Sequence, residues 1–172
     1  MQPCKVSSSN HGGYAELAML KNDYAGQNCS ISRALETVGE RWTLVIIREL
    51  LRRPHHFADL HEKLGISRNV LASRLEKLVE LGVVEKVLYT DSRDWYNYQL
   101  TRKGRDLFPV INALMAWGDK YDAPNGAPVI FEHGCGHAVG HRLVCEHCGG
   151  DVSVGSVRAI AGPGATEETI LD

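Results

Sequence analysis

The fold is decided by residues 57–84, which read FADLHEKLGISRNVLASRLEKLVELGVV. The apolar residues of the first part recur at helical spacing: Phe57, Leu60 and Leu64. Gly65 stands where a helix ends in the left-handed conformation that glycine adopts without strain. Ser67 is then a good N-cap for a second helix, whose apolar residues form one stripe: Val70, Leu71, Leu75, Leu78 and Leu81. Two helices joined by a tight turn that contains glycine predict a helix-turn-helix.

The residues before this stretch predict two more helices. The first has three apolar residues at helical spacing: Ile31, Leu35 and Val38. Gly39 stops it, and Thr43 is placed to cap the next helix, over residues 44–53. That second helix is apolar nearly all round, as expected of a helix at the centre of a domain.

After Gly82 the pattern changes to that of a β-hairpin. Residues 83–90 are rich in Val, Leu and Tyr, residues 91–94 are turn formers, and residues 95–100 alternate large and polar side chains. A hairpin directly behind a helix-turn-helix predicts a mainly α fold with a small β wing, the winged helix-turn-helix.

A last long helix is predicted from a cap at Thr101 to about Tyr121. Its apolar stripe is broad: Leu107, Val110, Ile111, Leu114, Met115, Trp117 and Tyr121. Pro109 falls inside this helix and predicts a kink, because proline removes one backbone donor. The expected organisation is a mobile arm, the winged domain, a Cys/His-rich appendage and a tail: residues 1–27, 28–122, 123–161 and 162–172.

Length and composition agree with one domain and short appendages. The chain has 172 residues, of which 44% are hydrophobic and 23% charged. No apolar run approaches the roughly 18 residues of a membrane span, and residues 1–10 lack the apolar core of a secretory signal, so we expect a cytoplasmic protein. The net charge is −2, but residues 28–122 carry 15 basic and 13 acidic residues, whereas residues 123–172 carry 2 and 6.

Several motifs, read together and in order, resemble the HxlR-type winged helix-turn-helix transcription regulators, relatives of the MarR group. They are Cys29, GERWT at 39–43, FADL at 57–60, GIS at 65–67, Leu71, RL at 74–75, LGVV at 81–84 and YQLT at 98–101. The resemblance covers roughly residues 28–121. It implies a homodimer that binds operator DNA, and a sensor role for the cysteine before the first helix in some members.

The fourth predicted helix carries a face suited to the DNA major groove. At 100° per residue, Asn69, Ala72, Ser73 and Glu76 lie opposite the apolar stripe, and Arg68 and Lys77 lie at the edges of that face. Asn is bidentate to adenine, Ser donates or accepts, and cations reach phosphate or guanine. The alternative is an ordinary solvated helix face, which the neighbouring motifs disfavour.

Four further residues are candidates for contact with DNA, and each also has a purely structural explanation. Arg74 is turned toward the apolar side, where it either contacts phosphate or pairs with Asp59 or Glu62. Arg93 at the hairpin tip is a candidate for the minor groove or a phosphate, or else a solvated turn residue. Thr43 and Ser67 begin helices, whose N–H groups suit a phosphate, although capping alone explains Thr43.

Cys29 precedes the first helix, where a thiolate is favoured near a helix N-terminus. The family resemblance makes it a candidate sensor of oxidants or electrophiles. The competing reading is a quiet thiol at a dimer interface, since no cationic neighbour is evident in the sequence.

The appendage concentrates three of the five cysteines and four of the eight histidines in residues 133–148. Cys145 and Cys148, followed by Gly149, match a zinc knuckle, and Cys135-Gly136 resembles half of a second one. The predicted site is structural Zn²⁺ in a small ribbon-like appendage, with Cys135, Cys145, Cys148 and either His133 or His137 as ligands. A ribbon without metal and a Cys145/Cys148 redox pair are the alternatives.

The expected function is a homodimeric, sequence-specific DNA-binding regulator with no enzymatic activity, which responds to redox state, an electrophile or a small ligand. The rival class is a metal- or thiol-dependent enzyme, or a small-molecule binding module, built on the Cys/His segment. The cluster offers no well-placed carboxylate base beyond Glu132 and Glu146, and adjacent knuckles favour a closed structural site over an open catalytic one.

Overall fold

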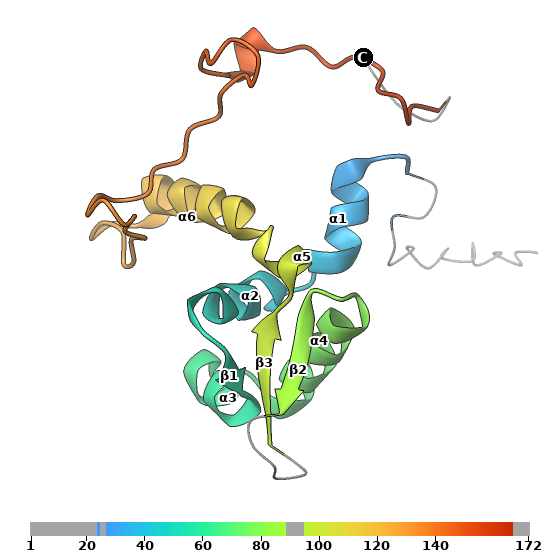
Figure 1. Cartoon of the computed structure of the whole chain (residues 1–172), viewed down its shortest axis with the longest axis vertical. Coiled ribbons are helices and arrows are strands. Elements are labelled where there is room, and N and C mark those ends of the chain that lie inside the picture. The colour runs from blue at the N-terminus through green and yellow to red at the C-terminus, as the bar shows by residue number, and fades with distance from the viewer. Residues whose placement is uncertain (1–23, 25–26, 89–94, 167–172) are drawn as a thin grey trace, which may run out of the picture.

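The protein is a winged helix-turn-helix domain from which a long C-terminal segment extends (Figure 1). The structure is a computed structural model that describes residues 24, 27–88 and 95–166. The predicted N-terminal arm therefore lies almost wholly outside the described residues, as does the turn that holds Arg93. No helix among the described residues is long and apolar enough to cross a membrane.

The first two helices are α1 (Ser30–Val38) and α2 (Thr43–Arg52), close to the predicted ranges. The prediction that Thr43 caps α2 is wrong. Trp42 is the N-cap residue, it has a φ of 79°, and Thr43 is the first helical residue, with a buried side chain. A bulky residue in the left-handed region is uncommon, which is why a pattern of cap residues alone pointed one position too far.

The helix-turn-helix itself is confirmed as α3 (Phe57–Leu64) and α4 (Arg68–Glu80). Gly65 ends α3 with a φ of 63°, and its N–H donates to the His61 carbonyl. The Ser67 hydroxyl accepts from the Val70 N–H at 3.3 Å and so caps α4. Both connections are local, so the sequence was sufficient to predict them.

The wing belongs to a three-stranded antiparallel sheet with the order β1-β3-β2. The hairpin strands β2 (Val84–Leu88) and β3 (Tyr96–Leu100) were predicted, and Val84 lies opposite Leu100. The strand β1 (His55–His56) was not, since two residues carry no periodicity. It pairs with β3 and ties the wing to the start of α3.

The core lies between the helices and the sheet. Its largest fully buried apolar side chains come from α2, α3, α4 and the start of the wing: Ile46, Ile47, Leu60, Leu71, Leu75, Leu78, Val83 and Val84. Gly104 is needed where the chain leaves the wing, because a Cβ there would lie 2.3 Å from the Val83 carbonyl oxygen and 2.9 Å from Leu100 Cδ2. Packing thus fixes the wing against α4 and the following helix.

The predicted last helix is two helices, α5 (Arg102–Arg105) and α6 (Phe108–Asp122). The Thr101 hydroxyl caps α5 by accepting from the Gly104 N–H at 3.2 Å, as expected. The expected kink at Pro109 is wrong, because Pro109 is the second residue of α6. Proline is tolerated there, since its missing N–H has no partner in the first turn of a helix.

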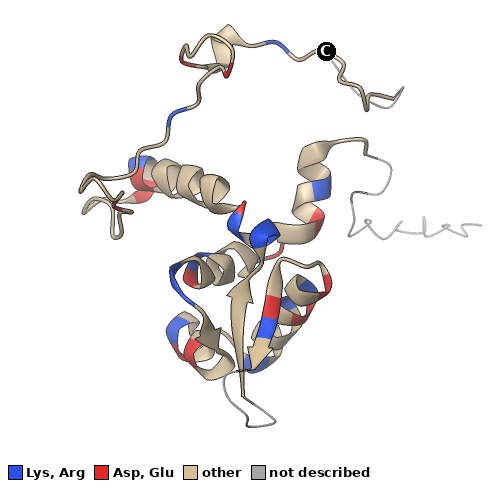
Figure 2. Ribbon diagram, in the orientation of Figure 1, with Lys and Arg blue, Asp and Glu red and all other residues tan. Residues whose placement is uncertain are grey.

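The C-terminal segment leaves α6 and returns to the N-terminal end of α1 (Figure 1). Phe108 packs edge-on against Phe131, and the Asn112 side chain donates to the Gly140 carbonyl at 3.1 Å. The Asn28 side chain donates to the Gly164 carbonyl at 2.8 Å. The segment contains one short 3-10 helix, η1 (Val154–Ser156), and few charged residues (Figure 2).

Candidate nucleic-acid interface and cysteine sites

The predicted reading face of α4 is exposed. Arg68, Asn69 and Ser73 are exposed with Glu76, whereas the opposite stripe is buried in the core. The Arg68 guanidinium lies 5.9 Å from the centre of the Phe57 ring, so α3 supports the first cation of this face. Basic and acidic residues alternate over α3, α4 and β2 (Figure 2), so the surface does not have a single sign of charge.

The two other cations of α4 are paired within the protein. The Lys77 ammonium lies 2.8 Å from Glu40 Oε1, and the Arg74 guanidinium pairs with Glu40 Oε2. Lys77 and Arg74 together hold the pKa of the Glu40 carboxyl below its ordinary value, mainly through the Lys77 hydrogen bond. The prediction that Arg74 pairs with Asp59 or Glu62 is wrong. Its partner is Glu40, which lies 34 residues earlier in the sequence.

The turn between α1 and α2 therefore binds α4 through ion pairs and a hydrogen bond. Glu40 contributes the carboxylate, and the Arg41 carbonyl accepts from Arg74 Nε at 3.3 Å. The Thr43 side chain is only 2% exposed, so its hydroxyl does not face a DNA phosphate in this structure. We call Glu40, Arg41, Arg74 and Lys77 the α4 clamp.

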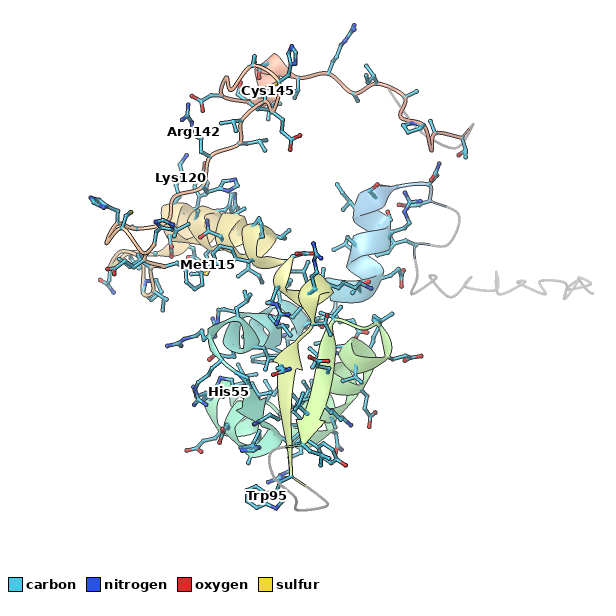
Figure 3. All side chains as sticks on the ribbon, viewed as in Figure 1. His55, Trp95, Met115, Lys120, Arg142 and Cys145 are labelled. Carbon is cyan, nitrogen blue, oxygen red and sulfur yellow. The ribbon has the colours of Figure 1, made fainter. Side chains whose placement is uncertain are left out.

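The described part of the wing ends in an exposed aromatic side chain. Trp95 is 62% exposed and projects from the end of β3 (Figure 3). Its ring makes an edge-to-face contact with the His56 ring, with 5.8 Å between ring centres. His56 Nδ1 lies 3.0 Å from the Tyr96 carbonyl. These residues lie beside the segment that contains Arg93, and sequence reasoning did not single them out.

His55 is a buried polar residue that the sequence pattern also did not reveal. It is 1% exposed, and neither ring nitrogen has a hydrogen-bond partner. Desolvation lowers the pKa of the His55 imidazole, with a further lowering from Arg53 and Lys63. Asp59 lies 3.9 Å from Nδ1 and opposes that shift, as does Glu49 more weakly.

Cys29 is the N-cap residue of α1 and is half-buried. The backbone N–H and the hydroxyl of Ser32 lower the pKa of its thiol, and the Ile31 N–H and the Arg33 guanidinium add to this effect. The Arg33 guanidinium hydrogen-bonds to Asn28 and Ser30, and its charge makes the smallest contribution to the lowered pKa of the Cys29 thiol. The arrangement favours a thiolate.

The second Cys/His turn of the appendage is formed as a knuckle. The Cys145 N–H donates to the Gly150 carbonyl at 2.9 Å, and the Gly149 N–H donates to the Cys145 carbonyl at 2.8 Å. Gly149 has a φ of 69°. Backbone N–H groups of Cys148 and His147 lower the pKa of the Cys145 thiol, and the Cys148 side chain contributes too.

The first turn is a shorter version of the same structure. The His133 N–H donates to the His137 carbonyl and the Gly136 N–H donates to the His133 carbonyl, both at 2.8 Å, and Gly136 has a φ of 82°. Cys135 Sγ lies 3.7 Å from His137 Nδ1, and the Cys135 N–H donates to His133 Nδ1 at 3.3 Å. His137 Nδ1 also lies 3.1 Å from the Cys135 carbonyl oxygen, so a hydrogen bond to the backbone accounts for its position in the turn.

The predicted four-ligand set is present as two pairs. No three metal-binding side chains among the described residues lie close enough together to hold one ion. Cys145 lies in the distal part of the segment, away from the labelled residues of α6 (Figure 3).

α6 carries an exposed apolar row. The residues fall at spacings of four, three and four, and each is at least 51% exposed: Val110, Leu114, Trp117 and Tyr121. Such a row on one face of a 15-residue helix is what a helix packed against another protein surface requires.

Comparison with known proteins decides the family. Residues 37–125, more than half of the chain, match the HxlR-like helix-turn-helix. The chain belongs to this family. Among HxlR-like proteins, it is 46% identical over 147 residues to MT3179 of Mycobacterium tuberculosis, an uncharacterized HTH-type transcriptional regulator, covering 84% of this chain and 92% of that one.

The chain is also similar to proteins of known structure. PA1607 is 32% identical, with a TM-score of 0.71, and the match covers 78% of this chain and 96% of that chain. The HTH-type transcriptional regulator YodB of Bacillus subtilis is 33% identical over 92 residues, or 53% of this chain and 82% of YodB. YodB has been solved in a reduced form and with quinone bound. Membership of this family makes the chain a transcriptional regulator.

Proposed function

We propose that α4 of this regulator enters the DNA major groove and reads bases through Asn69 and Ser73, while Arg68 binds phosphate or guanine. The observation that carries the proposal is the exposure of these three side chains on the second helix of the helix-turn-helix, beside the wing. Lys77 and Arg74 act as secondary phosphate contacts that Glu40 partly occupies in the free protein. We propose no catalytic role for the Cys/His segment.

Binding of the DNA upstream of the protein's own gene, measured by footprinting and fluorescence anisotropy, tests this proposal. Arg68→Ala should weaken binding to all sequences and make the log–log salt slope shallower by about 0.9. Asn69→Ala should cost about 1–3 kcal/mol of discrimination at one base pair. Lys120→Ala removes one cation from α6 and is the matched control. Equal effects of Arg68→Ala and Lys120→Ala, with base preference unchanged in Asn69→Ala, would reject the assigned face.

We propose that the functional unit is a homodimer formed through the exposed row of α6. A second copy of the row would bury the four apolar side chains that one chain exposes. A two-fold dimer presents two copies of α4, so half-sites should lie about 34 Å or a multiple of it apart. In sedimentation experiments Leu114→Asp should produce monomers, whereas Glu80→Gln, on α4, should not. A wild-type monomer at micromolar concentration would contradict the proposal.

We propose that Cys29 senses electrophiles or oxidants. The thiol sits at the start of α1 with Ser32 and Arg33 favouring its thiolate, and the relative YodB has been solved with quinone bound. The thiolate would add to an electron-poor ring carbon. The ring accepts the electron pair and then a proton, which leaves a covalent C–S bond.

Mass spectrometry and DNA binding after treatment with a benzoquinone test the sensor. The wild type and the matched control Cys4→Ser should form an adduct at Cys29 and change affinity, whereas Cys29→Ser should do neither. An unchanged response in Cys29→Ser would return Cys29 to a structural role. A response lost only in Cys145→Ser would place sensing in the appendage.

A further inference from the structure

We propose that Asn28 is a positioning residue for the Cys29 sensor, and that it fastens residues 162–166 of the C-terminal segment beside the thiol. We call these five residues the tail turn. While the tail turn is in place, small electrophiles reach Cys29 and bulky ones do not. The inference rests on the proposed sensor function of Cys29 and adds the class of electrophile that the sensor accepts.

The tail turn is bound to the residues that precede α1, where the C-terminal segment returns to the winged domain (Figure 1). Asn28 Nδ2 donates to the Gly164 carbonyl at 2.8 Å and to Thr166 Oγ1 at 3.0 Å. These partners lie 136 and 138 residues further along the chain, so the contact is a tertiary one. The Ala165 N–H donates to the Gly162 carbonyl at 3.0 Å, which closes the turn and fixes the backbone around Gly164.

The oxygen of the Asn28 amide connects the tail turn to the sensor. Asn28 Oδ1 accepts from Arg33 Nη1 at 3.0 Å, and Arg33 Nη2 donates to Ser30 Oγ at 3.4 Å. The same guanidinium is close enough to the Cys29 thiol for its charge to contribute to the lowered pKa of that thiol. One side chain therefore contacts both the tail turn and the cation beside the thiol.

The burial of the sensor segment agrees with this placement. Within residues 27–31, only Asn28 and Cys29 are half-buried, whereas Gln27, Ser30 and Ile31 are exposed. The shielded residues are thus the one that holds the tail turn and its neighbour. The tail turn itself is exposed along its whole length, so it can leave without opening the hydrophobic core.

The strength of the contact allows the tail turn to open and close. A net hydrogen bond corresponds to a factor of about 2–10 in an equilibrium constant. The two bonds from Asn28 therefore favour the closed form and still permit opening, and surface segments move faster than a thiol is modified. A small reagent reacts in the closed form, whereas a bulky one reacts only in the open form. The ratio of the two rates measures the open fraction.

The experiment labels the reduced full chain with N-ethylmaleimide and with the rigid, bulky N-(1-pyrenyl)maleimide. In both reactions the thiolate adds to the maleimide double bond, and the neighbouring carbon takes a proton from water. Because both probes use the same thiolate, the ratio of pyrenyl to ethyl rates does not depend on the thiol pKa. Peptide mass spectrometry gives this ratio for each cysteine, and the exposed Cys135 is the internal reference.

Two variants release the tail turn in different ways. Asn28→Ala should raise the rate ratio at Cys29 by about 4- to 100-fold, because both hydrogen bonds are lost. Thr166→Val leaves the contact between Asn28 and Arg33 in place and should raise the ratio by about 2- to 10-fold. The matched control is Asn112→Ala, which removes the hydrogen bond to the Gly140 carbonyl at the other attachment of the segment and should leave the ratio unchanged.

The wild-type ratio should be lower at Cys29 than at Cys135. Equal ratios at these two cysteines, or a Cys29 ratio that neither Asn28→Ala nor Thr166→Val raises, would overturn the proposal. A rise in Asn112→Ala as large as in Asn28→Ala would overturn the role of Asn28. These measurements use no DNA, so their failure is distinct from that of the sensor, which an unchanged DNA affinity after quinone treatment would reject.

Discussion

Replacing Glu40 by Gln should strengthen DNA binding. Glu40 pairs with both Lys77 and Arg74, and all three side chains are partly exposed, at 38%, 38% and 23%. Pairs with this exposure are worth about 0.2–1 kcal/mol each. If both cations turn to phosphates when α4 docks, the two pairs cost about 0.4–2 kcal/mol to break, and Glu40→Gln removes that cost. The expected gain is about 2- to 30-fold in affinity.

Anisotropy titrations at several salt concentrations, on one operator fragment, measure this effect. Each phosphate contact contributes about −0.9 to the log–log slope, and both proteins make the same contacts once the pairs are broken, so Glu40→Gln should raise the affinity with little change in slope. Glu80→Gln, on α4 but outside the α4 clamp, makes the same charge change and is the control. Equal affinities of the two variants, or weaker binding by a well-folded Glu40→Gln protein, would refute the idea that Glu40 competes with DNA.

Three other predictions concern stability, measured by urea unfolding. The pKa of His55 is lower in the folded chain than in the unfolded one, so its contribution to stability is complete above about pH 6.5 and is lost as the pH falls. His55→Leu should therefore reduce the decrease in unfolding free energy between pH 7.5 and pH 5. An unchanged pH dependence of the unfolding free energy would exclude His55 as its source. Gly104→Ala should cost about 1–3 kcal/mol or more, because its Cβ would overlap the Val83 carbonyl. Gly118→Ala, in open space on α6, should cost nothing, and a similar loss in both variants would show that packing at Gly104 is not the cause. Ser67→Ala should cost about 1 kcal/mol through the lost cap of α4, and an unchanged unfolding midpoint would argue against that cap.

The features predicted from the sequence are those with local causes. Gly65 and Ser67 end and begin helices through contacts within four residues, and the alternation in residues 95–100 identifies a strand without reference to the rest of the chain. The exposed face of α4 follows from the same periodicity, because the buried stripe fixes the opposite side.

The features that were missed depend on contacts between distant segments or on unusual backbone. Arg74 pairs with Glu40, which is far away in sequence, and no local pattern identifies that carboxylate. The left-handed Trp42 shifts the start of α2 by one residue. His55 is buried because β1 pairs with β3, and that contact appears only when the wing is folded.

The position of α1 gives the molecule a mechanical property. Cys29 caps one end of this nine-residue helix, and the other end runs directly into Glu40, whose carboxylate holds α4. At 1.5 Å per residue the helix is a rod about 13.5 Å long, so a tilt of about 10° around the thiol end displaces the far end by about 2 Å. A shift of that size exceeds the tolerance of the 2.8 Å contact between Glu40 and Lys77. If an adduct at Cys29 tilts α1 by this amount, the proposed sensor would act on DNA binding by weakening the contact between Glu40 and α4.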